Sequence, residues 1–425
     1  MTDTASLDEA SQPLRMRHFY LARQPVLDRN QALFGYELLF RGSAQGPAHF
    51  DSGLSASASV IHHASQLGLP RAIGDANAFI NVDKDVLMSD MFALLPRERT
   101  VLEIVASVEP DDAVIERMRV LGKHGFRFAA EAAAHGPALS RLLPVIDFVK
   151  MDLRALPAVT LLSLAPRLRT TGKRLVAEKV ENHGEYRTCL DIGFDYFQGY
   201  YFAKPSVLSS RKLSPSQTTV LDLVNLVASD ADNAEIEGVV KREVTIGLNL
   251  LRLVNTPAVG AGRRIESISQ ALTLLGRRQL QRWLQILLYA EPDVRGHSQS
   301  PLLQLATTRA RLMELLAQRL RPGQKNVADV AFTVGMMSLM DTLFCIPMMD
   351  IVEQIPVIDE VRAALLQRSG FFGELLKLAE SIERMDDEGD DMLAGLKSLS
   401  MDGDDLAELE VSAFEWSDKV VRYAI

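Results

Sequence analysis

The sequence has few of the residues that build disulfide frameworks or histidine-based metal centres. It contains two cysteines, Cys189 and Cys345, which lie far apart and lack the spacing of zinc ligands. This excludes a disulfide framework and is typical of a protein from a reducing compartment. Of its eight histidines, only His297 follows Ser206. The second half of the chain therefore has no histidine cluster for metal chemistry.

The chain also lacks an excess of basic residues and a long apolar run. Its formal net charge of −9 opposes unspecific binding of nucleic-acid phosphates. No run reaches the roughly 18 uncharged apolar residues that a membrane-spanning helix needs. The first 17 residues carry Asp3, Glu9 and Arg15 and no apolar core of a signal peptide, so we expect a disordered tail. A soluble cytoplasmic protein, with no nucleic acid or membrane as partner, is predicted.

The first half alternates strand-like apolar runs with amphipathic helical stretches. The opening pair of runs flanks the turn residues 28–30 and predicts a hairpin. Further strands are expected at 78–82, 100–105, 126–130, 148–153, 174–180 and 195–202. Helices are expected at 56–67, 111–124, 157–171 and 183–190. Such alternation predicts βαβ units that close into a TIM-like (β/α)₈ barrel, with its first strand antiparallel to the rest.

The second half has helical periodicity almost throughout, with apolar residues three and four positions apart. We expect an all-helical domain. The acidic stretch 385–405 does not match a calcium-binding loop and predicts a solvated loop around a short helix. The predicted organisation is a tail at 1–17, a barrel at 18–205, a Ser- and Pro-containing linker at 206–217 and a helical domain at 218–425.

Polar residues recur where the predicted barrel strands end. Functional side chains of such barrels lie at the carboxyl ends of the strands. Carboxylate and amide groups in that position suit Mg²⁺ or Mn²⁺ holding a phosphate. The residues are Glu37, Asn81, Glu103, Glu131, Lys150, Asp152, Glu178 and Gln198.

The ordered motifs YELLFR, FINV, LEIV, FAAEA, VKMD, AEKVE and QGYYFAKP resemble the EAL family of cyclic di-GMP phosphodiesterases over about residues 19–205. The resemblance implies that Glu37, Asn81 and Glu103 correspond to ligands of a first metal ion. Arg41 corresponds to an arginine that contacts a phosphate of the ligand, and Lys150 to the lysine beside the attacking water.

The same resemblance assigns the remaining matched residues. It makes Glu178 the carboxylate near a second ion, Glu181 its partner in the same motif and Gln198 the glutamine of the QG pair. Lys150, Glu178 and Glu181 are thus vestigial catalytic residues if the site is inactive. The candidate ligand-binding residues are Glu37, Arg41, Lys150, Asp152 and Gln198.

The departures from the family pattern concern the second ion. The paired aspartates of the family fall on Glu131 and Ala132, and Ala106 replaces a glutamate that helps to brace the following loop. Glu131 keeps a carboxylate that is one methylene longer, whereas Ala132 offers no ligand. Loss of one well-placed electrostatic group costs about 10²–10³ in rate. We therefore expect Glu37, Asn81, Glu103 and Glu131 to be a vestigial metal set without catalysis.

The helical half resembles the HDOD domain, a relative of the HD phosphohydrolases. The motifs are LLRLVNTPAVG at 250–260 and RIESISQALTLLGRRQLQRWL at 264–284, followed by helical runs at 327–344 and 358–380. His297 is followed by serine and not by aspartate, so the hydrolase chemistry is excluded. The adjacent pair His62-His63 points in two directions on a helix and is expected to pack or to face solvent.

Two functions remain at this point. The first is a non-catalytic signalling protein, with the barrel as a scaffold or cyclic di-GMP sensor and the HDOD domain engaging a protein partner. The barrel residues are then polar groups that bind the ligand or merely hold the barrel mouth. The second is a weak phosphodiesterase that converts cyclic di-GMP to linear pGpG with Mg²⁺ or Mn²⁺. No cofactor is expected to be required, Mg²⁺ or Mn²⁺ would bind weakly, and a homodimer is a family expectation.

Overall fold

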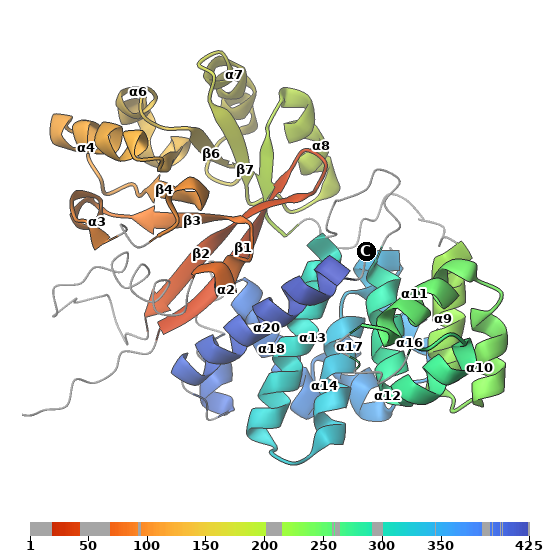
Figure 1. Ribbon diagram of the computed structural model, residues 1–425. Helices are drawn as coiled ribbons and strands as arrows, with labels where there is room; N and C mark the ends of the chain where they lie inside the picture. The colour runs from red at the N-terminus through yellow and green to blue at the C-terminus, as the bar shows by residue number, and fades with distance from the viewer. Residues whose placement is uncertain are drawn as a thin grey trace, which may run out of the picture.

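A computed structural model shows a β-barrel beside a larger group of helices (Figure 1). The predicted tail 1–17, the helix predicted at 56–67 with His62-His63, and residues 201–214 lie outside the described part. The described residues are 19–42, 69–91, 95–200, 215–256, 259, 264–290, 301–344, 346–384, 392, 394–399, 401 and 403–423.

The predicted hairpin is confirmed as strands β1 (Phe19–Asp28) and β2 (Leu33–Gly42). The Asp28 carboxylate accepts hydrogen bonds from the backbone N–H groups of Asn30 and Ala32, both at 2.8 Å. An aspartate that bonds its own following backbone favours a tight turn. The turn sets a register in which Gln24 lies opposite Glu37.

The barrel is closed by eight strands in sequence order, as predicted. β1 runs antiparallel to both β2 and β8, and the other neighbouring strands are parallel. The strands after the hairpin are β3 (Asn77–Val82), β4 (Thr100–Ile104), β5 (Arg127–Glu131), β6 (Phe148–Asp152), β7 (Arg174–Glu178) and β8 (Tyr196–Gln198).

The barrel interior has an apolar layer below a polar one. Phe79 and Phe148 meet edge to face with ring centroids 5.5 Å apart, and Tyr196 lies 5.8 Å from Phe148. Side chains two residues apart on a strand point to the same side. Asn81, Lys150 and Gln198 therefore follow these rings into the barrel, nearer the carboxyl ends of the strands.

Three of the barrel's helices begin at side-chain caps that the sequence provides. Asp83, Asp111 and Asn182 each accept a hydrogen bond from the backbone N–H three residues later. The helices of one or two turns were not predicted, because they are too short to show periodicity. The barrel's helices are α2 (Leu69–Ile73), α3 (Lys84–Met88), α4 (Asp112–Lys123), α5 (Ala132–His135), α6 (Leu139–Leu142), α7 (Ala158–Arg169) and α8 (His183–Ile192).

Among the described residues, the chain from Pro215 onward forms only helices and the turns that connect them. Gly335 of α14 faces the backbone of α13, with Ala310 Cα 2.5 Å from where a Cβ would lie, so only glycine permits this approach. The helices are α9 (Pro215–Ala228), α10 (Asn233–Val240), α11 (Val244–Val254), α12 (Ile268–Tyr289), α13 (Pro301–Leu320), α14 (Lys325–Met337), α15 (Met340–Phe344), α16 (Met348–Gln354), α17 (Asp359–Gln367), α18 (Gly370–Glu383) and α20 (Gly403–Tyr423).

Two details refine the predicted organisation. Helix α9 begins at Pro215, within the stretch 206–217 that the sequence indicated as a linker. Within the described residues, one helical stretch, Lys325–Phe344, is long and apolar enough to span a membrane, although the sequence analysis found no such run. It is 67% buried inside the helical body, which is what a core helix requires.

The helical body packs against the outer side of the hairpin, with α20 beside β1 and α2 (Figure 1). The Arg23 guanidinium lies 3.9 Å from the centroid of the Phe414 ring and 4.3 Å from that of Tyr36. It also pairs with Asp418 of α20 at 3.2 Å and donates to the Ala72 carbonyl at 2.7 Å. This buried arginine therefore joins both bodies.

Gly199, directly after β8, is predicted to tolerate no side chain. Its φ is +146°, and a Cβ there would collide with the backbone of Val180. Gly199→Ala should therefore lower the free energy of unfolding by about 2–4 kcal/mol, from backbone strain and overpacking together. The matched control is Gly122→Ala, because Gly122 is a helical glycine with open space around its Cβ position. This substitution should raise the free energy of unfolding by about 0.5–1 kcal/mol. Denaturant unfolding checks both, and equal stability of the two variants would contradict the packing described.

Candidate functional site

The polar layer of the barrel is organised around Lys150 of β6. Its Nζ lies 2.8 Å from Glu37, 2.7 Å from Glu103 and 2.8 Å from Glu178. These carboxylates come from β2, β4 and β7, so three separate strands converge on one ammonium group. The Lys150 side chain is 1% exposed. Six predicted site residues, counting Asn81 and Gln198 below, thus meet at the carboxyl ends of the strands.

Neutral amides complete the surroundings of Glu37. Gln198 Nε2 donates to its carboxylate at 2.7 Å, and Asn81 Nδ2 donates at 3.3 Å. Gln198 also donates to the side-chain oxygen of Gln24 on β1. A buried carboxylate is tolerated when charge-assisted hydrogen bonds replace its water, and Glu37 receives such bonds from three side chains.

Burial and Lys150 act in opposite directions on these groups. Burial disfavours the charge of Glu37, but Lys150 and the two amide donors, Gln198 and Asn81, hold its pKa below the ordinary value. Burial raises the pKa of Glu103 well above its usual range, and that of Glu178 to about 7, with Lys150 opposing the shift in both. Burial would lower the pKa of Lys150, yet the carboxylates hold it well above the ordinary value. The ammonium is therefore charged at neutral pH.

Two other predicted residues lie at the rim. Asp152 accepts hydrogen bonds from the backbone N–H groups of Arg154 at 2.6 Å and Ala155 at 3.2 Å, and pairs with Lys179 at 3.2 Å. Glu181 is about half exposed and pairs with Arg154 at 3.3 Å.

At the position of the family's aspartate pair, only the first residue, Glu131, carries a carboxylate. Glu131 ends β5 opposite Lys150 in the strand register, and the next residue, Ala132, is buried and begins α5. Burial is the main cause of the raised pKa of Glu178, and the charge of Glu131 adds to it. No oxygen donor is available at position 132.

Arg41 belongs to β2, with Tyr20 as its partner in the strand register. Its side chain is outside the described atoms. Gln24 is a member of the polar layer that the sequence analysis missed. The available signal was its inward position on β1 opposite Glu37, but it depends on the exact register of the hairpin.

The polar layer contains oxygen donors of the kind that a hard divalent ion prefers. Glu37, Asn81 and Glu103 supply the oxygen donors that Mg²⁺ and Mn²⁺ prefer, and the Lys150 ammonium already shows that the cluster attracts a cation. Among the described residues, however, no group of three or more acidic, histidine or cysteine side chains surrounds an open metal position. Lys150 would have to move for an ion to bind at these three residues.

The structure is that of a two-domain protein, in which a TIM-like barrel with an acidic cluster at its carboxyl edge is joined to an all-helical domain. The family models that match are the EAL domain over residues 6–205 and the HDOD domain over residues 213–356. CdgJ of Vibrio cholerae, named a cyclic di-GMP phosphodiesterase, is 30% identical over 95% of this chain and 93% of its own length. The chain belongs to the EAL–HDOD family.

One more curated protein and several solved structures are also similar to this chain. YuxH of Bacillus subtilis, an uncharacterised protein, is 29% identical over 86% of this chain and 90% of its own. Among solved structures, an EAL domain protein from Listeria monocytogenes is 21% identical over 44% of this chain and 87% of that one, with a TM-score of 0.35. The B. subtilis protein YkuI has an EAL domain and was solved with cyclic di-GMP and calcium. It is 21% identical over 61% of this chain and 71% of its own, with a TM-score of 0.36.

Lys150→Met is predicted to destabilise the metal-free protein by about 3–5 kcal/mol, because buried carboxylates would lose their shared counter-charge. In the control Lys179→Met, the half-exposed pair with Asp152 is lost at a cost below about 1 kcal/mol. Denaturant unfolding in the presence of a chelator measures both. A Lys150 variant as stable as the Lys179 variant would show that the buried ion pairs do not form.

Glu178 is predicted to make stability depend on pH. Because its folded pKa is about 7 against an ordinary 4.5, the folded chain keeps a proton that the unfolded chain loses. The contribution is present below pH 4.5 and is lost as the pH rises through 7. In Glu178→Gln this loss should vanish, and stability against pH should be flatter across that window. The rim variant Glu181→Gln should keep the wild-type slope; an unchanged slope in Glu178→Gln would contradict the assignment.

Proposed function

We propose that this protein is a cyclic di-GMP signalling protein whose barrel binds the dinucleotide without efficient hydrolysis and whose HDOD domain engages a partner protein. Membership of the EAL–HDOD family and the similarity to CdgJ support the ligand. The observation that carries the non-catalytic assignment is Ala132, a buried residue without an oxygen donor where a second metal ligand is needed.

The argument against efficient hydrolysis is electrostatic. A two-ion phosphodiesterase uses both ions to activate the attacking water and to neutralise the phosphate. With Glu131 alone, the second ion is held weakly and its contribution to the transition state is lost. One well-placed electrostatic group is worth about 10²–10³ in rate, and a whole ion is worth more.

Binding is expected to depend on a cation, although a site with no required cofactor was the sequence-based expectation. That expectation has no support from the family matches, because EAL domains generally use Mg²⁺ or Mn²⁺. A phosphate approaching the cluster meets the carboxylates of Glu37, Glu103 and Glu178, which pair with Lys150 among the described side chains. A divalent ion at Glu37, Asn81 and Glu103 would release Lys150 toward the phosphate. Arg41, Asp152 and Gln198 are the remaining candidate ligand contacts.

A second function, weak hydrolysis of cyclic di-GMP to linear pGpG, is favoured by the full-length similarity to CdgJ, a named phosphodiesterase. In that case Glu131 replaces the absent aspartate pair. In either case we propose a cytoplasmic location, a protein partner for the HDOD domain and self-association of the barrel into a dimer.

Calorimetric titration of the full chain with cyclic di-GMP is predicted to show binding that strengthens at least about 10-fold with Mn²⁺, the factor for one charge-assisted contact. Chromatography of the same samples should show no pGpG beyond one equivalent. Multiple turnover would replace the sensor by the phosphodiesterase. No heat with or without Mn²⁺ would overturn both functions.

The double variant Glu131→Asp with Ala132→Asp is predicted to restore the missing ligand pair. Thermal shift with Mn²⁺ should then rise above that of the wild type, because added ion binding stabilises the folded chain. The variant Ala138→Asp, which adds an acid elsewhere in the same loop region, is the matched control. Equal Mn²⁺ shifts in all three proteins would mean that position 132 is not the lost ligand position.

A further inference from the structure

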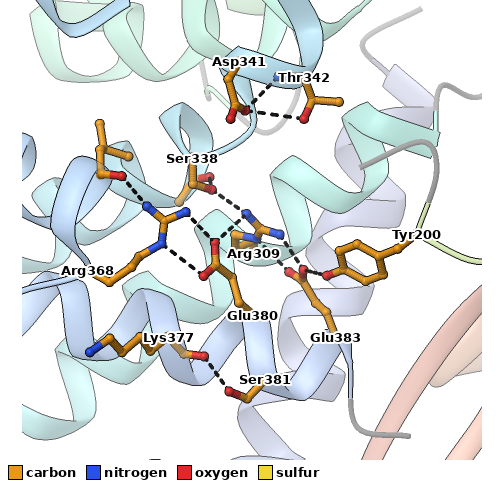
Figure 2. Close-up of polar contacts among 12 residues, drawn as sticks. Tyr200, Arg309, Ser338, Asp341, Thr342, Arg368, Lys377, Glu380, Ser381 and Glu383 are labelled. Carbon is orange, nitrogen blue, oxygen red and sulfur yellow. Dashed lines mark hydrogen bonds and ion pairs between the residues drawn. The ribbon is translucent and has the colours of Figure 1, made fainter. Parts of the chain in front are cut away.

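A buried arginine organises the polar core of the helical domain. Arg309 of α13, with a side chain 2% exposed, donates to Glu383 of α18 from Nε at 2.8 Å and from a terminal nitrogen. It also donates to Ser338 Oγ at 2.8 Å and lies 3.7 Å from Glu380. Figure 2 shows these partners around one guanidinium. Because a buried charge needs a partner, this pair holds α13 to α18.

One member of this network comes from the barrel. Figure 2 shows Tyr200 approaching Glu383 from the side opposite Arg309, and its hydroxyl donates to the Glu383 carboxylate. Burial and the charge of Glu383 raise the pKa of Tyr200 well above its usual range, so the phenol stays protonated and can donate. Tyr200 lies two residues after Gln198, the donor to Glu37 in the barrel site.

The connection between Gln198 and Tyr200 is stiff. Gly199 lies so close to the Val180 backbone that no side chain fits, and the Val180 N–H donates to the Gln198 carbonyl at 3.0 Å. Val180 in turn lies two residues after Glu178, which pairs with Lys150. This packing joins the backbone that carries Tyr200 directly to the strand ends that carry Gln198 and Glu178.

The interface beside this connection has room for movement. A cavity of about 60 Å³ lies between the hairpin and the helices α13, α18 and α20, lined by residues that include Tyr36, Leu312, Ile382 and Phe414. The Tyr36 hydroxyl is buried there without a hydrogen-bond partner among the described residues. Well-packed interiors have few such voids, and polar contacts between domains permit relative motion.

We propose that Tyr200, Glu383 and Arg309 form a latch that reports the state of the barrel's polar cluster to the helical domain. Displacing Gln198 withdraws Tyr200 from Glu383, while the Arg309–Glu383 pair remains intact inside the helical domain. Release breaks one hydrogen bond to a carboxylate. That bond favours the attached over the released state by about 10- to 100-fold. This deepens the proposed function by connecting its ligand site to the partner-binding domain, and it rests on that function for the identity of the ligand alone.

A variant cycle on the full chain, followed by amide hydrogen exchange, tests the latch without any ligand. Gln198→Met keeps the length of the side chain and removes its hydrogen bonds to Glu37 and Gln24. We expect exchange in α18 to become about 10-fold faster relative to α14, which serves as the reference inside the helical domain, from the loss of one such bond. In a Tyr200→Phe background the same change should add less than about 2-fold, since the bond is already absent.

The matched control is Tyr186→Phe, which removes a tyrosine hydrogen bond to the Arg29 carbonyl within the barrel. In that background Gln198→Met should keep its full effect on α18. If Gln198→Met does not fold, Glu37→Gln weakens the same contact with nearly the same shape. Equal effects in the wild-type and Tyr200→Phe backgrounds, or no effect on α18 in either, would overturn the latch.

A ligand arm separates this proposal from the proposed function. Cyclic di-GMP with Mn²⁺ is added to wild type and to Tyr200→Phe, with binding measured by calorimetry. Binding that changes α18 exchange in the wild type alone supports the latch, and binding that changes both proteins equally overturns it. Absence of binding overturns the proposed function, while the variant cycle still decides the latch.

Discussion

The barrel site depends on one constraint: a buried ammonium group must balance carboxylates that arrive from three strands. Lys150 is within 2.8 Å of Glu37, Glu103 and Glu178. Removing the ammonium would leave those charges without compensation in a low-dielectric interior, which is among the costliest changes a fold can suffer. The same constraint limits function. A cation or phosphate can enter the cluster only if Lys150 moves away from these carboxylates and forms another contact.

The positions of the polar residues could be predicted from sequence, because strands of period two in a parallel barrel bring their carboxyl ends to one edge. Glu37, Glu103 and Glu178 do converge there. Their pairing with a single lysine could not be predicted, since it follows from the closure of the barrel and not from any local pattern. Gln24 was missed for a related reason: only the hairpin register places it opposite Glu37.

The hairpin explains how the two domains act as one molecule. Alternate residues of β1 face opposite sides, so Gln24 reaches the interior while Arg23 stacks on Phe414 and pairs with Asp418 of the helical domain. Sequence periodicity predicted both domains but not this contact. This contact is recognised only when Phe414 and Asp418, almost 400 residues away in the chain, are known to lie beside Arg23.

Because Ala132 offers no ligand side chain, we expect the barrel to bind one metal ion, and counting the bound ions tests this most directly. A crystal structure with Mn²⁺ and cyclic di-GMP, phased on the anomalous signal of manganese, locates each ion. We predict one anomalous peak beside Glu37, Asn81 and Glu103, with the Lys150 ammonium turned toward a phosphate. Two well-occupied peaks, the second beside Glu131 and about 3.5–4 Å from the first, would describe an intact two-ion centre and contradict the account.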